Sequence, residues 1–165
     1  MKNKKFCSIA ALLLVCILGL VTACGAPMGK GSLDNADITY DYLKEDYPEM
    51  LLTDGAEHLI GSIEFSKAED GSLQVILHPK EAASKANDDG TYTVSSYAIN
   101  RVLVLSDSMF GVASGSEDIL SMEEFPAVVQ GEFDDSIMYD VYTMDDQILL
   151  IMYNPDYVLP DPGAK

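Results

Sequence analysis

The sequence is poor in cysteine, with three residues at positions 7, 16 and 24 of a 165-residue chain. Cys7 and Cys16 lie in an apolar N-terminal stretch, so the rest of the chain holds Cys24 alone. A lone cysteine cannot form an intramolecular disulfide, and zinc sites built from cysteine and histidine clusters are excluded as well. The part of the chain after this stretch must therefore fold by burial alone, for which about 140 residues are sufficient.

Basic residues are also scarce, with 10 lysines and arginines against 27 aspartates and glutamates. Three of the ten precede the apolar stretch, and the others are scattered from Lys30 to Lys165 without a cluster. Nucleic acids and anionic lipid headgroups are bound mainly through lysine and arginine. We therefore expect no nucleic-acid partner. The negative charge is explained by solubility, with a functional acidic face as the alternative.

The N-terminus has the pattern of an export signal. Three lysines stand in the first five residues, an apolar stretch runs from about Phe6 to Val21, and small residues follow it. That stretch is marginal for a membrane-spanning helix, which needs about 20 mostly apolar residues. The sequence Val21-Thr22-Ala23-Cys24 resembles the lipobox of bacterial lipoproteins. The resemblance implies cleavage before Cys24 and a covalent diacylglycerol on its thiol.

This resemblance sets the address of the protein. It implies a lipid-anchored protein on the extracytoplasmic face of the cell membrane. We expect no cofactor besides the lipid. We expect a signal peptide at 1–23, a flexible tether at 24–38, one β-rich domain at 39–157 and an extended Pro-rich tail at 158–165. The mature chain would keep seven basic and 27 acidic residues, a formal charge of −20. The alternative is a secreted protein cleaved nearby, in which Cys24 is incidental.

Alternating apolar residues predict the strands of the domain. The two runs 58–65 and 73–78, joined by Glu69-Asp70-Gly71, indicate a β-hairpin. A long strand is predicted at 92–105, bent by a bulge at Ser95-Ser96. Before the bulge the inward-facing positions are even-numbered, beginning with Tyr92, and after it they are odd-numbered, beginning with Tyr97. Two further strands are predicted at 137–143 and 147–153.

Helical signals are fewer than strand signals. Ser121 and Glu124 form a capping-box pattern, and Pro126 predicts that the helix beginning there is short. One other short helix is expected after Tyr40 and before Pro48.

The order of elements is therefore strand, strand, long bent strand, helix, strand, strand. This is the order of the OB-fold, a small, partly open five-stranded barrel with one short helix between its third and fourth strands. The prediction is a mostly β domain of this OB-like kind, with a two-layer α+β sheet as the alternative.

The candidate metal and catalytic residues fall into three groups. In the predicted hairpin His78 lies opposite about Gly61 or Ser62, which separates it from His58 by about 13 Å, too far to share a metal. Asp88 and Asp89 are the best candidates for calcium, although Asn87-Asp88-Asp89-Gly90 also has the composition of a turn. No G-x-S-x-G elbow is present, although a hydrolase that uses paired carboxylates stays open.

Tyrosine is the remaining candidate for binding, with nine residues in the chain. Tyr92, Tyr142 and Tyr153 are the predicted ligand-binding residues, whereas Tyr97 and Tyr139 are expected in the core. The leading hypothesis is a noncatalytic accessory lipoprotein that binds a ligand or partner, such as an envelope protein or a glycan. The alternatives are an acidic cation-binding envelope protein and a cell-envelope hydrolase.

Overall fold

The computed structural model describes residues 38–129 and 133–160. The predicted signal peptide, the lipobox with Cys24 and nearly all of the tether lie outside the described residues. The helices are α2 (Tyr40–Lys44), α3 (Asp46–Thr53) and α4 (Glu124–Val129). The strands are β1 (Glu57–Lys67), β2 (Leu73–Ala82), β3 (Tyr92–Ser96), β4 (Arg101–Val112), β5 (Tyr139–Met144), β6 (Gln147–Tyr153) and β7 (Tyr157–Val158).

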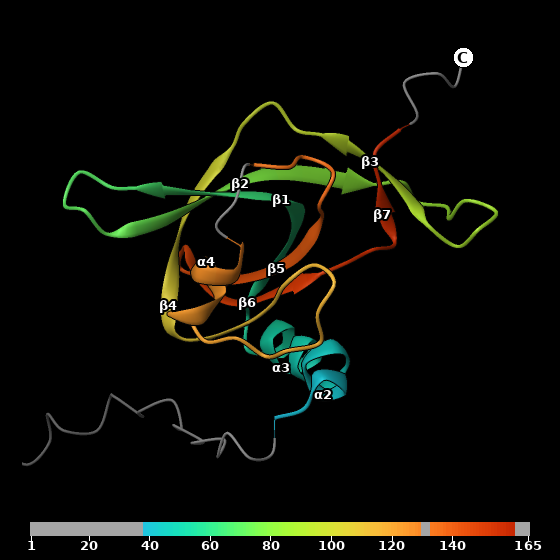
Figure 1. Cartoon of the computed structure of the whole chain (residues 1–165). Helices are drawn as coiled ribbons and strands as arrows, with labels where there is room; N and C mark the ends of the chain where they lie inside the picture. Colours follow the sequence, from blue (N-terminus) through green and yellow to red (C-terminus); the bar gives the residue numbers. More distant parts are fainter. Residues whose placement is uncertain (1–37, 130–132, 161–165) are drawn as a thin grey trace, which may run out of the picture. The chain divides into compact units, whose positions relative to one another are not determined.

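Five of these strands close into a barrel. They pair in the order β1-β5-β6-β4-β2, and β2 pairs again with β1, so the sheet returns to its start (Figure 1). Every pairing in this ring is antiparallel except β4 with β6. The short helix α4 stands in the chain between β4 and β5. The prediction of a mostly β, OB-like barrel is confirmed, and the two-layer alternative is wrong because the first strand is paired on both sides.

The strand β1 can pair on both sides because it bends at Gly61. Residues 57–61 pair with β5 and residues 60–67 pair with β2, so Gly61 has partners on both sides. A Cβ at this position would collide with the carbonyl oxygen of His78 and with the side chain of Leu77. Glycine is therefore required at the corner of the barrel.

The barrel interior is the first of two cores. Its fully buried members include Val75 and Leu77 from β2, Leu103 from β4 and Ile148 from β6. The helix α4 adds Phe125, which is fully buried against the backbone of β4. One half of the capping box forms, since the Glu124 carboxylate accepts the Ser121 amide at 3.0 Å. The Ser121 hydroxyl donates to the same carboxylate at 2.8 Å.

The predicted long strand at 92–105 is wrong. The segment is divided into β3 and β4, and Tyr97 and Ile99 lie between them with 54% and 78% of their surfaces exposed. The change of parity comes from this break, because β3 pairs with the last residues of β2 whereas β4 pairs with its first half. The irregularity in pairing occurs later, between Leu105 and Phe110, and β4 continues to Val112.

The N-terminal helical prediction also requires correction. The predicted short helix before Pro48 is present as α2, but a second helix follows it, and Pro48 lies inside this helix, α3. Proline is tolerated there because it stands in the first turn, where the backbone amide has no intrahelical acceptor. Thr39 caps α2, with its hydroxyl accepting the Tyr42 amide at 3.2 Å.

These helices build a second core on the outside of the barrel. Leu43 from α2 and Leu51 from α3 pack with Tyr142, Leu150 and Met152, which point outward from β5 and β6. Both faces of β5 and β6 are consequently covered, one by the barrel interior and one by the helices (Figure 1).

The predicted tail begins at the last strand of the sheet, and its residues 161–165 lie outside the described residues. Tyr157 and Val158 form β7, which pairs in parallel with Tyr92 and Thr93 of β3 at the end of the strand order. A two-residue edge strand is compatible with the neighbouring prolines. In the described part of the chain, no helix has the length and apolar character needed to cross a membrane.

Candidate ligand pocket

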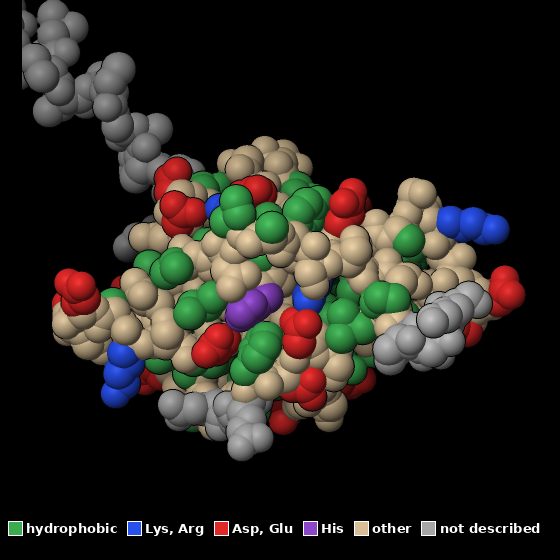
Figure 2. Space-filling view, turned by 90° about the horizontal axis from the view of Figure 1, so that it is seen from above, with side chains coloured by type: hydrophobic (Ala, Val, Ile, Leu, Met, Phe, Trp, Pro, Cys, Tyr) green, Lys and Arg blue, Asp and Glu red, His purple; other side chains and the backbone are tan. Residues whose placement is uncertain are grey.

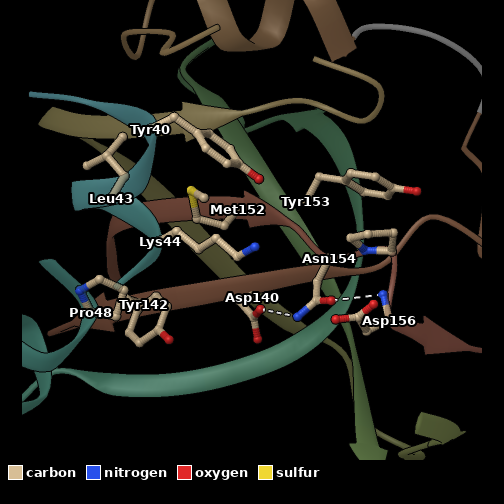
Figure 3. Close-up of a pocket in the computed structure, with 11 residues that line it drawn as sticks. Tyr40, Leu43, Lys44, Pro48, Asp140, Tyr142, Met152, Tyr153, Asn154 and Asp156 are labelled. Carbon is tan, nitrogen blue, oxygen red and sulfur yellow. Dashed lines mark hydrogen bonds between the residues drawn. The ribbon is translucent and has the colours of Figure 1, made fainter. Parts of the chain in front are cut away.

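A pocket of about 190 Å³ lies at the edge of the second core, between α2, the start of α3, and the β5–β6 pair (Figure 3). Its lining combines apolar side chains, aromatic rings and charged groups. The lining residues are Tyr40, Leu43, Lys44, Pro48, Asp140, Tyr142, Met152, Tyr153, Asn154, Pro155 and Asp156.

Asp140 is held in a fixed position on the wall of this pocket. Its Oδ1 lies 2.7 Å from His58 Nε2 and accepts the Tyr157 hydroxyl at 3.3 Å. Its Oδ2 accepts the Asn154 side-chain amide at 2.7 Å. The side chain is 16% exposed. A carboxylate has about four lone-pair directions, so these three partners leave one for a ligand.

Strand register explains why these groups meet. His58 stands opposite Tyr142, and Asp140 lies two residues before Tyr142, on the same face of β5. Asn154 comes directly after β6, where its backbone amide donates to the Met138 carbonyl at 2.9 Å. Because β5 lies between β1 and β6 in the sheet, His58 and Asn154 approach Asp140 from opposite sides.

The neighbouring tyrosines stay protonated over the physiological range. Burial first, and the charge of Asp140 second, raise the pKa of Tyr142 to about 12. Burial and the same carboxylate raise the pKa of Tyr157 well above its ordinary value. The His58 ring stacks on Tyr142 with 4.7 Å between centroids and an interplanar angle of 13°. Because its pKa is raised, Tyr157 keeps its hydroxyl proton and donates it to Asp140.

Two of the three predicted ligand-binding tyrosines belong to this pocket. Tyr142 and Tyr153 line it, whereas Tyr92 lies on β3, where its ring is 6.5 Å from that of Tyr157. Of the tyrosines expected in the core, Tyr139 is buried but Tyr97 is exposed.

Sequence reasoning missed Lys44, Asp140 and Asn154. Asp140 could have been noticed as a charged residue in the apolar run 137–143. The run Ile148 to Met152 is apolar without interruption, which indicates a strand buried on both faces and hence a second layer. Lys44 carried no signal of its own.

Asp88 and Asp89 are far less organised for binding. Asp89 Oδ1 accepts the Thr91 amide at 3.0 Å and its hydroxyl at 2.7 Å, and these bonds lower the pKa of Asp89. Gly90 has φ of +88°, so the segment behaves as a turn. Among residues 38–129 and 133–160, no group of three or more metal-ligating side chains comes together.

The second histidine belongs to a different cluster. His78 lies opposite Ser62, as the predicted hairpin required, and its Nε2 is 3.4 Å from Glu64 Oε2. Nearby, the buried Lys80 ammonium donates to both oxygens of Asp135 at 2.7 and 2.8 Å. This cluster ties the segment before β5 to the hairpin.

The pocket lining offers hydrogen-bonding and aromatic groups. Its lining contains no serine, threonine or cysteine to act as a nucleophile. Asp140 and Asp156 both reach it, but Asp140 is occupied by three hydrogen-bonding partners and His58 stands behind the lining. What the groups offer a ligand is a mixture of fixed acceptors, one ammonium donor and aromatic surface.

Charge over the rest of the surface follows the composition. On the face in Figure 2, carboxylates are spread around the surface and basic side chains are few, in keeping with the formal charge of −17. Comparison with protein-family models, curated proteins and solved structures finds no match to this chain. The pocket must therefore be interpreted from its own geometry.

Proposed function

We propose that this chain is a noncatalytic lipoprotein, anchored by lipid on Cys24 at the extracytoplasmic face of the cell membrane, that binds a ligand in the pocket beside α2. The observation that carries the binding role is the fixed Asp140 carboxylate, held by three donors on the wall of a pocket of about 190 Å³. The support for the address is the resemblance of residues 21–24 to a lipobox.

The address is tested by mass spectrometry of the full-length protein expressed in a bacterium that processes lipoproteins. We expect the N-terminal peptide to begin at Cys24 and to carry the mass of a diacylglycerol. Cys24→Ser should abolish the lipid and release the protein from the membrane fraction. Cys16→Ser is the matched control, because it changes a cysteine inside the predicted signal and should leave lipidation intact. An unmodified Cys24 in the wild-type protein would remove the anchor from the proposal.

The binding role is tested by thermal unfolding in the presence of a library of small polar metabolites. A ligand that binds only the folded state raises the melting temperature. Tyr40→Ala should abolish that rise because Tyr40 lines the pocket from α2. Tyr92→Ala is the matched control, a partly exposed tyrosine outside the lining. A rise that persists in Tyr40→Ala and disappears in Tyr92→Ala would place binding elsewhere.

A further inference from the structure

We infer that the pocket beside α2 takes one neutral sugar ring, such as the terminal residue of a glycan. The inference rests on the proposed function, because it names the class of ligand for the same site. Three features carry it: the size of the pocket, the balance of donors and acceptors in its lining, and the aromatic rings around them (Figure 3).

The size suits a single ring. A buried cavity of about 150 Å³ in another protein holds benzene, and the present pocket measures about 190 Å³. Sites for drug-sized molecules begin at about 300 Å³. The pocket is open to solvent on one side. A six-membered ring therefore fits inside while any chain attached to it extends into water.

The polar lining carries charges of both signs. Lys44 only donates hydrogen bonds, whereas Asp140 and Asp156 only accept them when ionised. In Figure 3 the Lys44 amine points across the pocket toward Asp140 and Asn154, but no ion pair involving Lys44 is found among the described residues. A free anion would meet two carboxylates and the net negative charge of the chain, and a simple cation would leave the Lys44 ammonium without an acceptor.

A neutral polyol satisfies both kinds of group at once. Each sugar hydroxyl donates one hydrogen bond and accepts others, so neighbouring hydroxyls can bridge the Lys44 ammonium and the Asp140 carboxylate. Hydrogen bonds to charged groups are shorter and stronger than those between neutral groups. Because three protein donors already orient Asp140, its carboxylate needs no reorganisation when the ligand arrives.

Aromatic rings supply the remaining contact. Tyr40 from α2 and Tyr142 from β5 line the pocket and belong to the second core, and Figure 3 shows Tyr40 above and Tyr142 below the Lys44 side chain. The Tyr153 ring instead packs on Tyr139 of the barrel core, with 6.2 Å between centroids. A tyrosine ring offers a flat apolar surface with a polar hydroxyl at its edge. The C–H face of a pyranose can lie on such a ring while its hydroxyls reach the charged groups.

The test uses three ligands that share one ring and differ in charge: glucose, glucosamine and glucuronic acid. Galactose, mannose and N-acetylglucosamine extend the neutral set, and choline and acetate serve as ions without a sugar ring. Saturation-transfer NMR and calorimetry on the full-length protein at pH 7 measure the affinities. We expect at least one neutral sugar to bind with a dissociation constant near 1 mM, an order of magnitude typical of a ligand of about 12 heavy atoms.

Glucuronic acid should bind at least tenfold more weakly than the neutral sugar, and glucosamine should bind no more tightly than it. Tyr40→Ala should weaken the neutral sugar at least tenfold, and Tyr92→Ala should leave it unchanged. Lys44→Met changes an exposed helix residue. It should lower the affinity for the neutral sugar, because it removes a hydrogen-bond donor. It should raise the affinity for glucosamine, because it removes a positive charge that repels the amino group. Circular dichroism of each variant verifies that it is folded.

The outcomes separate this inference from the proposed function. Binding of choline or acetate, lost in Tyr40→Ala, without binding of any neutral sugar would overturn the sugar class and leave the ligand site standing. Tighter binding of a charged analogue would do the same. Neutral sugars that bind Tyr40→Ala as well as the wild type would overturn the assignment to this pocket. Absence of binding by every probe at 50 mM would refute the inference and count against the pocket as a ligand site.

Discussion

The buried ion pair between Lys80 and Asp135 should respond very differently to the loss of each partner. The Lys80 side chain is 2% exposed, and its ammonium donates to both Asp135 oxygens and to Ser96 at 2.9 Å. The Asp135 side chain is 44% exposed and also accepts the Ser62 hydroxyl. One charge is thus removed from water whereas the other is nearly half hydrated.

Asp135→Asn leaves a buried ammonium without a counter-charge. Breaking a buried pair in this way costs about 3–5 kcal/mol, and we expect the lower end because Ser96 still accepts a hydrogen bond from Lys80. Lys80→Met leaves a carboxylate that water and Ser62 can solvate, and methionine fills the space, so we expect about 1 kcal/mol. The double variant has no unpaired charge and should be close to Lys80→Met.

Urea unfolding followed by circular dichroism measures these differences. For a domain of this size, about 3 kcal/mol corresponds to a fall in melting temperature of roughly 6–12 °C. Glu57→Gln is the matched control: its carboxylate is 2.6 Å from Arg101, but the two side chains are 56% and 32% exposed, so the cost should stay below about 1 kcal/mol. A smaller loss for Asp135→Asn than for Lys80→Met would refute the argument from burial.

The same pair gives a direction for the dependence on pH. Burial, the largest single influence, acts to raise the pKa of Asp135, but hydrogen bonds from Lys80 and Ser62 outweigh it and lower that pKa below its ordinary value. A carboxyl with a lowered folded-state pKa stabilises the fold above its ordinary pKa, and this contribution disappears as pH falls through the lowered value. Asp135→Asn should therefore reduce the sensitivity of stability to acid.

Two further predictions concern the barrel. Gly61→Ala should lower the free energy of unfolding, measured with urea, by about 1–3 kcal/mol, because the new Cβ would collide with the His78 carbonyl. A loss under about 0.5 kcal/mol would show that β1 does not need glycine at this position. Burial raises the pKa values of Tyr139 and Tyr142 to about 12, so their absorbance should change near pH 12. The tyrosines of the unfolded chain lose their protons near pH 10. The free energy of unfolding should therefore fall between about pH 10 and 12, by about 3 kcal/mol per tyrosine. A single absorbance transition near pH 10 for all tyrosines would contradict this.

The barrel was predictable because its signals are local. The β1–β2 hairpin is specified by alternating apolar residues and by the turn at 69–71, and its register puts His78 opposite Ser62 as expected. The helix after Ser121 was found through its capping box. Periodicity of two and turn composition act over neighbouring residues, so they can be recognised without knowledge of the fold.

The pocket was not predictable because it joins segments that are distant in sequence. Lys44 comes from α2, Asp140 from β5 and Asn154 from the end of β6, and only the closed barrel and the helices outside it bring them together. The break between β3 and β4 has the same cause. Parity alone cannot distinguish a bulge within one strand from two strands that pair with different parts of β2.

Asp140 is the position where local pattern and tertiary structure disagree most. It lies on the outer face of β5 next to the second core, where Tyr142 and Met152 are buried. An apolar residue there would extend that core, whereas a carboxylate loses hydration and requires compensation. The chain provides it with donors from His58, Asn154 and Tyr157. Because conflicts of this kind concentrate at functional sites, the presence of this charge and its three donors is the main structural support for the proposed ligand site.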